Sequence, residues 1–232
     1  MRVSFFERVL DLIIPRVCSI CGRRLSPGED FICVECNLHL PRTYYAEDAY
    51  ENEMAKLFWG RIPIERSTAL FFYEAGSEAC RIIYDLKYNQ RPEYGYYLGK
   101  MVAQEVQANG FFTGIDLLVP IPLARKRQWQ RGYNQSMEIA KGVEEVTHIP
   151  IAPHVIRRNK FESSQTQKDR WERMVNVSHV FELIHPEEVK DKHILLIDDV
   201  VTTGSTICAC GKQLEKAGGV KISVLSIGFA KS

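Results

Sequence analysis

The sequence lacks an excess of charge of either sign, a long apolar run and an internal repeat. Its 30 lysine and arginine residues nearly balance 29 aspartate and glutamate residues, so the formal net charge is +1 over 232 residues. This balance excludes a polycation, and any contact with nucleic acid must therefore use a local basic patch. No run approaches the roughly 18–20 apolar residues of a membrane-spanning helix, which predicts a protein with no transmembrane segment.

A secretory signal and a disulfide framework are also missing. Residues Met1–Pro15 are apolar at helical spacing, but Glu7, Arg8 and Asp11 interrupt them, which predicts a short amphipathic helix without a cleavage site. The cysteines number seven, an odd total, and three of them, Cys80, Cys208 and Cys210, are scattered. These features argue against a secreted protein and predict a cytoplasmic location.

The other four cysteines form two Cys-x-x-Cys pairs near the N-terminus. Cys18 and Cys21 are separated by 11 residues from Cys33 and Cys36. Two such pairs can close on one tetrahedral zinc ion, and four thiolates would saturate it, so the predicted role is structural. The alternative is two reduced or disulfide-linked pairs without metal. A small module of this kind can also dock nucleic acid or protein.

Apolar runs alternate with helical-period segments after the cysteine module. Strands are predicted at 67–73, 116–123, 151–157, 177–183, 193–198 and 221–229, and helices at 77–86, 94–107, 135–146 and 205–217. Alternation of this kind predicts an α/β fold with a mainly parallel sheet flanked by helices. We expect residues 1–41 to form the N-terminal helix and zinc-binding module and residues 42–232 the larger domain. The polar stretch Arg158–Asn176 is predicted to be a mobile loop that closes over a ligand.

The segment Ile194–Thr206 carries the strongest functional signal. Four apolar residues predict a buried strand that ends at Asp198 and Asp199, and a helix is expected directly after Gly204. Backbone amides and the positive end of the helix dipole would converge there on a phosphate group. The two carboxylates are suited to vicinal ribose hydroxyls. The predicted contacts are Asp198, Asp199, Val200, Val201, Thr202, Thr203, Gly204, Ser205 and Thr206.

A buried strand, an acidic turn and a capped helix would explain each of these residues separately, but would not require all of them together. The segment resembles the phosphoribosyl pyrophosphate motif of type I phosphoribosyltransferases. This resemblance implies that fold, with Asp198 and Asp199 on the ribose hydroxyls and Thr202–Thr206 on the 5-phosphate. It further implies that one acid supports the positive charge that develops at C1 during transfer.

A basic stretch follows the strand predicted at 116–123. Its cations can neutralise a diphosphate and stabilise it as a leaving group. An exposed basic helix start is an equal alternative. The predicted diphosphate contacts are Arg125, Lys126, Arg127 and Arg131. Trp129 lies among these cations, as in a surface for single-stranded nucleic acid, although packing against the domain is the default for such a side chain.

Further segments are similar to the ComF family of competence-associated proteins. They are the cysteine spacing, Leu86-Lys87-Tyr88, Val119–Leu123, Arg131–Gln135, a stretch from Gln165 to Asn176 and the Asp198–Gly204 motif. The resemblance implies a zinc module joined to a phosphoribosyltransferase-like domain, a role in DNA uptake during natural transformation, and Lys87 as a further ligand contact.

Three functions stay open from the sequence. The first is Mg²⁺-assisted transfer of a 5-phosphoribosyl group from phosphoribosyl pyrophosphate to an acceptor, with the magnesium ion held largely by the ligand and water. The second is a non-catalytic module that binds single-stranded DNA or docks to DNA-uptake machinery. The third is a ligand-responsive regulator with the same fold, because a fold does not determine a function.

Overall fold

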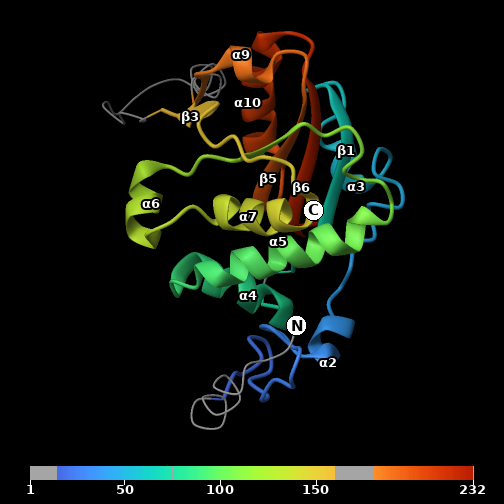
Figure 1. The fold of residues 1–232 in the computed structure, drawn as a ribbon, viewed down its shortest axis with the longest axis vertical. Helices are drawn as coiled ribbons and strands as arrows, with labels where there is room; N and C mark the ends of the chain where they lie inside the picture. Colours follow the sequence, from blue (N-terminus) through green and yellow to red (C-terminus); the bar gives the residue numbers. More distant parts are fainter. Residues whose placement is uncertain (1–14, 75, 160–179, 232) are drawn as a thin grey trace.

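The computed structural model describes residues 15–74, 76–159 and 180–231 (Figure 1). The predicted N-terminal helix and almost all of the polar stretch Arg158–Asn176 lie outside these residues. Within the described ranges, no helix combines the length and the apolar character needed to cross a membrane.

The centre of the protein is a four-stranded parallel sheet. Its strands lie in the order β1-β6-β5-β2, so β5 is an inner strand that pairs with β6 on one side and with β2 on the other. Parallel strands need crossover connections, and helices supply these on both faces (Figure 1). The predicted parallel α/β fold is confirmed. The strands are β1 (Ile64–Phe72), β2 (Leu117–Pro120), β5 (His193–Val201) and β6 (Lys221–Phe229).

Helices occupy most of the positions that the apolar periodicity predicts. The helices are α2 (Val34–Leu38), α3 (Glu53–Lys56), α4 (Glu78–Tyr88), α5 (Pro92–Gln107), α6 (Arg125–Arg131), α7 (Gln135–Thr147), α9 (Pro186–Val189) and α10 (Ser205–Leu214), with a 3₁₀ turn at Glu215–Ala217. Helices α5 and α7 pack closely because Gly99 has no side chain. A Cβ atom at this position would collide with the carbonyl of Ile139.

The side chains of β5 point alternately into two apolar cores. Leu195 and Ile197 belong to the core beneath α4, α5 and α7, whereas Ile194 and Leu196 belong to the core beneath α3 and α10. This alternation follows from the two-residue period of a strand, and burial on both faces explains why the strand reads as a continuous apolar run. The sheet is thereby a rigid base for residues at the end of β5.

One predicted element differs from the structure, and the sequence leaves a second one open. The strand predicted at 151–157 is reduced to β3 (Ile156–Arg158), which pairs antiparallel with β4 (Phe181–Leu183) in a separate two-stranded sheet. The basic stretch after β2, for which an exposed helix start is one of two equal alternatives, forms the short helix α6. Single-sequence periodicity does not decide between them because α6 has no buried residue and therefore no apolar stripe.

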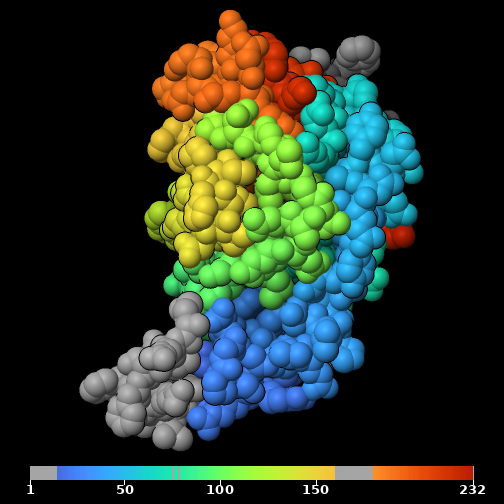
Figure 2. Space-filling view, turned by 45° about the vertical axis from the view of Figure 1, so that its right-hand side comes forward, coloured from blue at the N-terminus to red at the C-terminus, as the bar shows by residue number. Residues whose placement is uncertain are grey.

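The cysteine module packs against the larger domain at one end of the molecule (Figure 2). The ring of Phe31 stacks on Tyr97 of α5 with centroids 5.3 Å apart, and Cys18 and Cys33 belong to the same apolar core as α4 and α5. The ion pair Arg42–Glu105, 2.7 Å long, lies near this junction. The division into residues 1–41 and 42–232 stays a prediction.

Candidate functional site

Two carboxylates stand at the carboxyl end of the inner strand β5. Asp198 Oδ1 accepts hydrogen bonds from the Ser136 hydroxyl at 3.1 Å and from the backbone N–H of Asp199 at 2.9 Å. Asp199 Oδ2 lies 3.2 Å from the Nζ atom of Lys87, at the end of α4. The carboxylates therefore have different partners, and helices from distant parts of the chain hold both in place.

Asp198 ionises less readily than an ordinary aspartate carboxyl group. Burial raises the pKa of Asp198 to about 7, and the neighbouring negative charge of Asp199 acts in the same direction. The hydrogen bonds from Asp199 and Ser136 and the charge of Lys87 oppose this rise in pKa but do not cancel it. A buried carboxyl group with a pKa near neutrality is typical of a ligand-binding or catalytic site.

The turn between β5 and α10 has the form predicted for a phosphate site. Helix α10 begins at Ser205, directly after Gly204, whose φ of +68° is the left-handed conformation. A Cβ atom at Gly204 would lie 2.7 Å from the ring of the buried Phe58. Thr202, Ser205 and Thr206 are exposed, so hydroxyls surround the free N–H groups at the start of the helix.

Cations face the carboxylates across a cavity of about 200 Å³. Arg158 reaches it from β3, and burial together with the neighbouring Arg127 lowers the pKa of Arg158. Such crowding of guanidinium groups favours the binding of an anion. The lining consists of Lys87, Ile121, Pro122, Leu123, Arg127, Arg131, Gln135, Ser136, Arg158, Asp198, Asp199, Val200 and Thr206.

Contacts at its C-terminal end hold α6 beside this cavity. Gly132 ends the helix in the left-handed conformation, and the hydroxyl of Tyr133 donates to the carbonyl of Leu86. The next residue, Asn134, donates from Nδ2 to the carbonyl of Ile121 at 3.0 Å, and its side-chain oxygen caps α7. The stretch from 131 to 135 is thus a structural joint between α4, β2 and α7.

The structure brings together some of the predicted contacts and separates others. Arg125 and Lys126 are exposed and do not line the cavity, and Val201 is buried in the core instead. Thr203 is exposed and accepts from Arg61 through its backbone carbonyl, at 3.3 Å. The predicted residues that line the cavity are Lys87, Arg127, Arg131, Asp198, Asp199, Val200 and Thr206.

Sequence reasoning missed Ser136 and gave Arg158 no role beyond the polar loop. Ser136 follows Asn134 and Gln135 at the start of a predicted helix, where a polar run is a signal for capping but not for contact with residue 198. Arg158 lies at the end of β3, whose position depends on its antiparallel pairing with β4. No local sequence pattern predicts a pairing between strands that are far apart in the chain.

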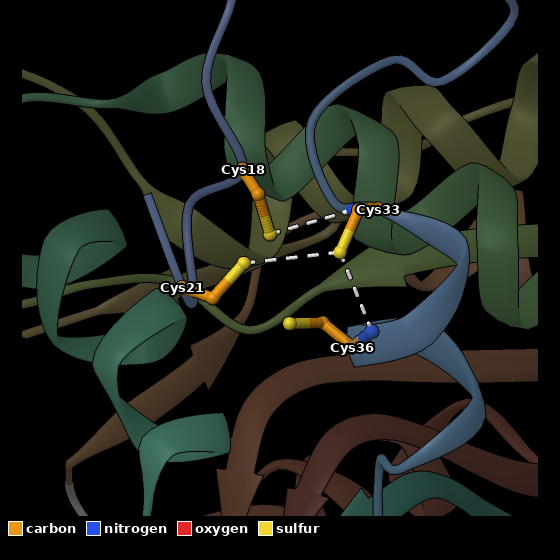
Figure 3. Close-up of side chains that lie close together, drawn as sticks. All are labelled: Cys18, Cys21, Cys33 and Cys36. Carbon is orange, nitrogen blue, oxygen red and sulfur yellow. Dashed lines mark hydrogen bonds between the residues drawn. The ribbon is translucent and has the colours of Figure 1, made fainter. Parts of the chain in front are cut away.

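The cysteine quartet has the geometry of a metal site. Figure 3 shows the four sulfur atoms turned toward a common centre, and all of them lie within 4.8 Å of one another. Tetrahedral zinc with Zn–S bonds of about 2.3 Å would separate its sulfur ligands by about 3.8 Å. The Sγ atoms of Cys21 and Cys33 are 3.8 Å apart, too far for a disulfide.

The electrostatics of the four thiols also favour a cation. Burial opposes ionisation of Cys18, but N–H groups of Cys21, Cys33 and Ile20 outweigh it and lower the pKa of this thiol to about 7. Burial and hydrogen bonds with the neighbouring sulfur atoms raise the pKa of Cys36. Crowded thiols cannot all ionise unless a positive ion compensates their charge, so these residues fit a zinc ion that they could hold in common.

Comparison with known proteins agrees with this geometry. A model described as the phosphoribosyl transferase domain matches residues 132–230. DNA utilization protein YhgH of Escherichia coli (strain K12) is 26% identical over 223 residues, which cover 92% of this chain and 96% of the relative. Competence protein F of Haemophilus influenzae is 32% identical over 116 residues, which cover 50% of this chain and 51% of the relative.

A third relative, competence protein ComFC of Bacillus subtilis (strain 168), is 31% identical over 112 residues, covering 48% of this chain and 43% of the relative. The chain is therefore a homologue of these DNA utilization and competence proteins. Its fold is that of a type I phosphoribosyltransferase, preceded by a four-cysteine module. The matched phosphoribosyl transferase domain contains Ser136, both carboxylates and the turn after β5, whereas Lys87 and the cysteine quartet precede it.

Proposed function

We propose that this chain binds phosphoribosyl pyrophosphate in the cavity at the end of β5. The observation that carries the proposal is that a carboxylate pair, a helix N-terminus and a cluster of cations converge there from five elements of the fold. A sugar diol, a 5-phosphate and a diphosphate need these three kinds of partner.

Each part of the ligand has a matching group. Asp198 and Asp199 accept from the ribose hydroxyls, and the amides and hydroxyls of the turn 202–206 hold the 5-phosphate. Arg127, Arg131 and Arg158 neutralise the diphosphate. A magnesium ion would enter bound to the diphosphate and water, and would add positive charge there. Lys87 now pairs with Asp199 and would also lie beside the bound ligand.

Transfer would use the same contacts. The bond between C1 and the diphosphate oxygen breaks, its electron pair leaves with the diphosphate, and a lone pair of the acceptor forms the new bond to C1. The acceptor's proton, where it has one, passes to solvent or to a basic group. The carboxylate nearer C1 would stabilise the positive charge that develops on the sugar, and the arginines would stabilise the departing diphosphate.

Calorimetry with phosphoribosyl pyrophosphate, with and without Mg²⁺, tests binding. Ribose 5-phosphate and inorganic diphosphate serve as half-ligands, and each should bind more weakly than the whole. If phosphoribosyl pyrophosphate binds no better than inorganic diphosphate, the carboxylates and the turn do not hold the sugar phosphate. Release of diphosphate with and without candidate acceptors then distinguishes an enzyme from a binding module or a regulator.

We also propose a role in DNA uptake. The relatives' names refer to DNA utilization and competence, and α6 has a surface suited to a single strand. Trp129 is 87% exposed, so the expectation that it packs against the domain is wrong. Arg125 and Lys126 are exposed on the same helix. Exposed aromatic rings among cations suit stacking of bases beside a phosphate backbone.

This second candidate predicts that a labelled single-stranded oligonucleotide binds through Trp129. Trp129→Ala should weaken binding by about 1–3 kcal/mol, the usual effect of one lost stacking contact. Trp59→Ala is the matched control, because Trp59 is 40% exposed and already packs against Tyr50 in a tilted arrangement, with ring centroids 5.6 Å apart. Equal affinity of the two variants would reject α6 as the DNA surface.

We propose further that Cys18, Cys21, Cys33 and Cys36 bind one structural zinc ion per chain. All seven cysteines are free thiols, which fits the reducing environment of a cytoplasmic location. Metal analysis should find one zinc per chain and a marked loss in Cys33→Ser. Cys80→Ser is the control, because this cysteine is also buried but lies outside the quartet. A folded protein with little zinc would contradict the proposal.

A further inference from the structure

A second cavity, of about 480 Å³, adjoins the first between the end of α4 and the inner side of α6. Lys87, Arg127 and Arg131 line both cavities. Its volume lies within the usual range for small-molecule sites, roughly 300–1,000 Å³. The described residues that line it are Lys87, Tyr88, Gln90, Arg127, Gln130 and Arg131.

The lining of this second cavity has three cations, two amides and no carboxylate. Within the part of the chain that the structure describes, Arg127 makes no hydrogen bond or ion pair, and neither side-chain amide has a partner. A guanidinium group without an acceptor favours a phosphate, and amides can pair with the polar edge of a heteroaromatic ring.

Tyr88 supplies an aromatic wall. Its side chain is 60% exposed, while the guanidinium of Arg131 lies 5.3 Å from its ring centroid and the ring of Tyr84 lies at 4.9 Å. Arg131 is itself fixed by a 2.8 Å hydrogen bond to Gln135. These contacts hold the tyrosine ring in place, so little conformational freedom is lost when a second planar group stacks on it.

Backbone strain marks the mouth of the same cavity. Gln90 has a φ of +52°, a left-handed conformation that costs a residue with a side chain roughly 1–2 kcal/mol. Strain of this kind persists where the surroundings impose it and is concentrated at ligand sites. Here it places a side-chain amide beside Tyr88 and across from the cations of α6.

We propose that this second cavity binds a nucleotide. Its ring stacks on Tyr88, its phosphate binds Arg127 and Arg131, and the ring edge pairs with the amides of Gln90 and Gln130. The site rests on the proposed function and goes beyond it, because Tyr88, Gln90 and Gln130 would recognise a second ligand whose phosphate shares Arg127 and Arg131 with the diphosphate. A free nucleotide and the end of a single strand offer the same chemistry.

Calorimetry with thymidine 5′-monophosphate, thymidine and inorganic phosphate tests the proposal on the full chain. The monophosphate should bind more tightly than either part, and Tyr88→Ala should weaken it by about tenfold without changing the affinity for inorganic phosphate. Tyr50→Ala, which changes another exposed tyrosine outside the cavity, should bind like the parent. An equal affinity for the monophosphate and inorganic phosphate, or no effect of Tyr88→Ala, would overturn the nucleotide site.

Two further arms identify the source of the ligand and separate the proposals. An oligonucleotide of five thymidines that binds more tightly than the monophosphate, and loses this advantage in Tyr88→Ala, assigns the cavity to a strand. Tighter binding of the monophosphate assigns it to a free nucleotide. Failure of the parent protein to bind phosphoribosyl pyrophosphate would refute the proposed function, whereas the part of thymidine monophosphate binding that is lost in Tyr88→Ala reports on the second cavity, because Tyr88 does not line the first.

Discussion

The turn after β5 and the helix α6 both contribute residues to the same cavity, yet they are built in opposite ways. The turn follows an inner strand of the sheet, and Gly204 in it is packed against the buried ring of Phe58. Helix α6 has no buried residue, and contacts at its C-terminal end hold it in place. Substitution of the packed Gly204 should therefore affect folding, whereas substitutions of exposed residues in α6 should affect ligand binding alone.

The largest difference is expected between two glycines with the same backbone conformation. Gly204→Ala should lower the free energy of unfolding by about 2–5 kcal/mol, because strain at positive φ adds to the collision with Phe58. Gly132→Ala, at the end of α6, carries the strain alone and should cost about 1–2 kcal/mol. Urea unfolding measures both. Equal losses would show that packing does not distinguish the two regions.

Charge removal in α6 should act on binding alone. Arg127→Gln should weaken binding of phosphoribosyl pyrophosphate by about 1.5–3 kcal/mol, the range for a charge-assisted hydrogen bond. Arg125→Gln is the matched control on the same helix, because Arg125 does not line the cavity. Calorimetry gives the affinities, and the free energies of unfolding should stay within about 0.5 kcal/mol of the parent. Equal weakening by both variants would indicate a long-range electrostatic effect of the helix and not a direct contact between Arg127 and the ligand.

Raising the pH should lower the free energy of unfolding and raise the affinity for phosphoribosyl pyrophosphate, because Asp198 loses its proton. The pKa of this carboxyl is raised to about 7 from 3.8, so the folded state retains a proton that the unfolded chain releases between these values. The stabilisation from that proton is fully present below about pH 4 and is lost as the pH rises through about 7. Binding of the sugar hydroxyls needs the carboxylate, so affinity should rise as stability falls.

Asp198→Asn is the control for this pH dependence, since an amide does not titrate. Unfolding and calorimetry at pH 6, 7 and 8 should show a smaller slope of both quantities in the variant than in the parent. Identical slopes would mean that other groups, including the phosphates of the ligand, control the pH dependence.

The smallest effect is expected at the most exposed side chain of the comparison. Trp129→Ala should change the free energy of unfolding by no more than about 0.5 kcal/mol, because the side chain is 87% exposed. Phe58→Ala, next to the turn, should cost about 3–5 kcal/mol, because that ring is fully buried. Urea unfolding of the pair measures the contrast. A loss above about 1 kcal/mol for Trp129→Ala would show that α6 packs more than its surface indicates.

The same contrast explains what the sequence alone predicts. Strand β5 was predictable because burial on both faces gives an apolar run. The start of α10 was predictable because Gly204 marks the turn before the helix. The cysteine quartet was predictable from spacing alone. Helix α6 was only one of two alternatives, since no apolar stripe marks it. The contact of Ser136 with Asp198 was not predictable, because it depends on the packing of α7 against β5.

The most direct test of the account compares the parent protein with the double variant Asp198→Asn, Asp199→Asn in calorimetry with phosphoribosyl pyrophosphate and Mg²⁺. Asparagine preserves the shape of both side chains, so the variant should fold. Loss of two charge-assisted hydrogen bonds to the ribose, at about 1.5–3 kcal/mol each, predicts an affinity lower by about a hundredfold or more, with binding of inorganic diphosphate largely retained. An unchanged affinity for phosphoribosyl pyrophosphate in the folded double variant would contradict the assignment of the carboxylate pair.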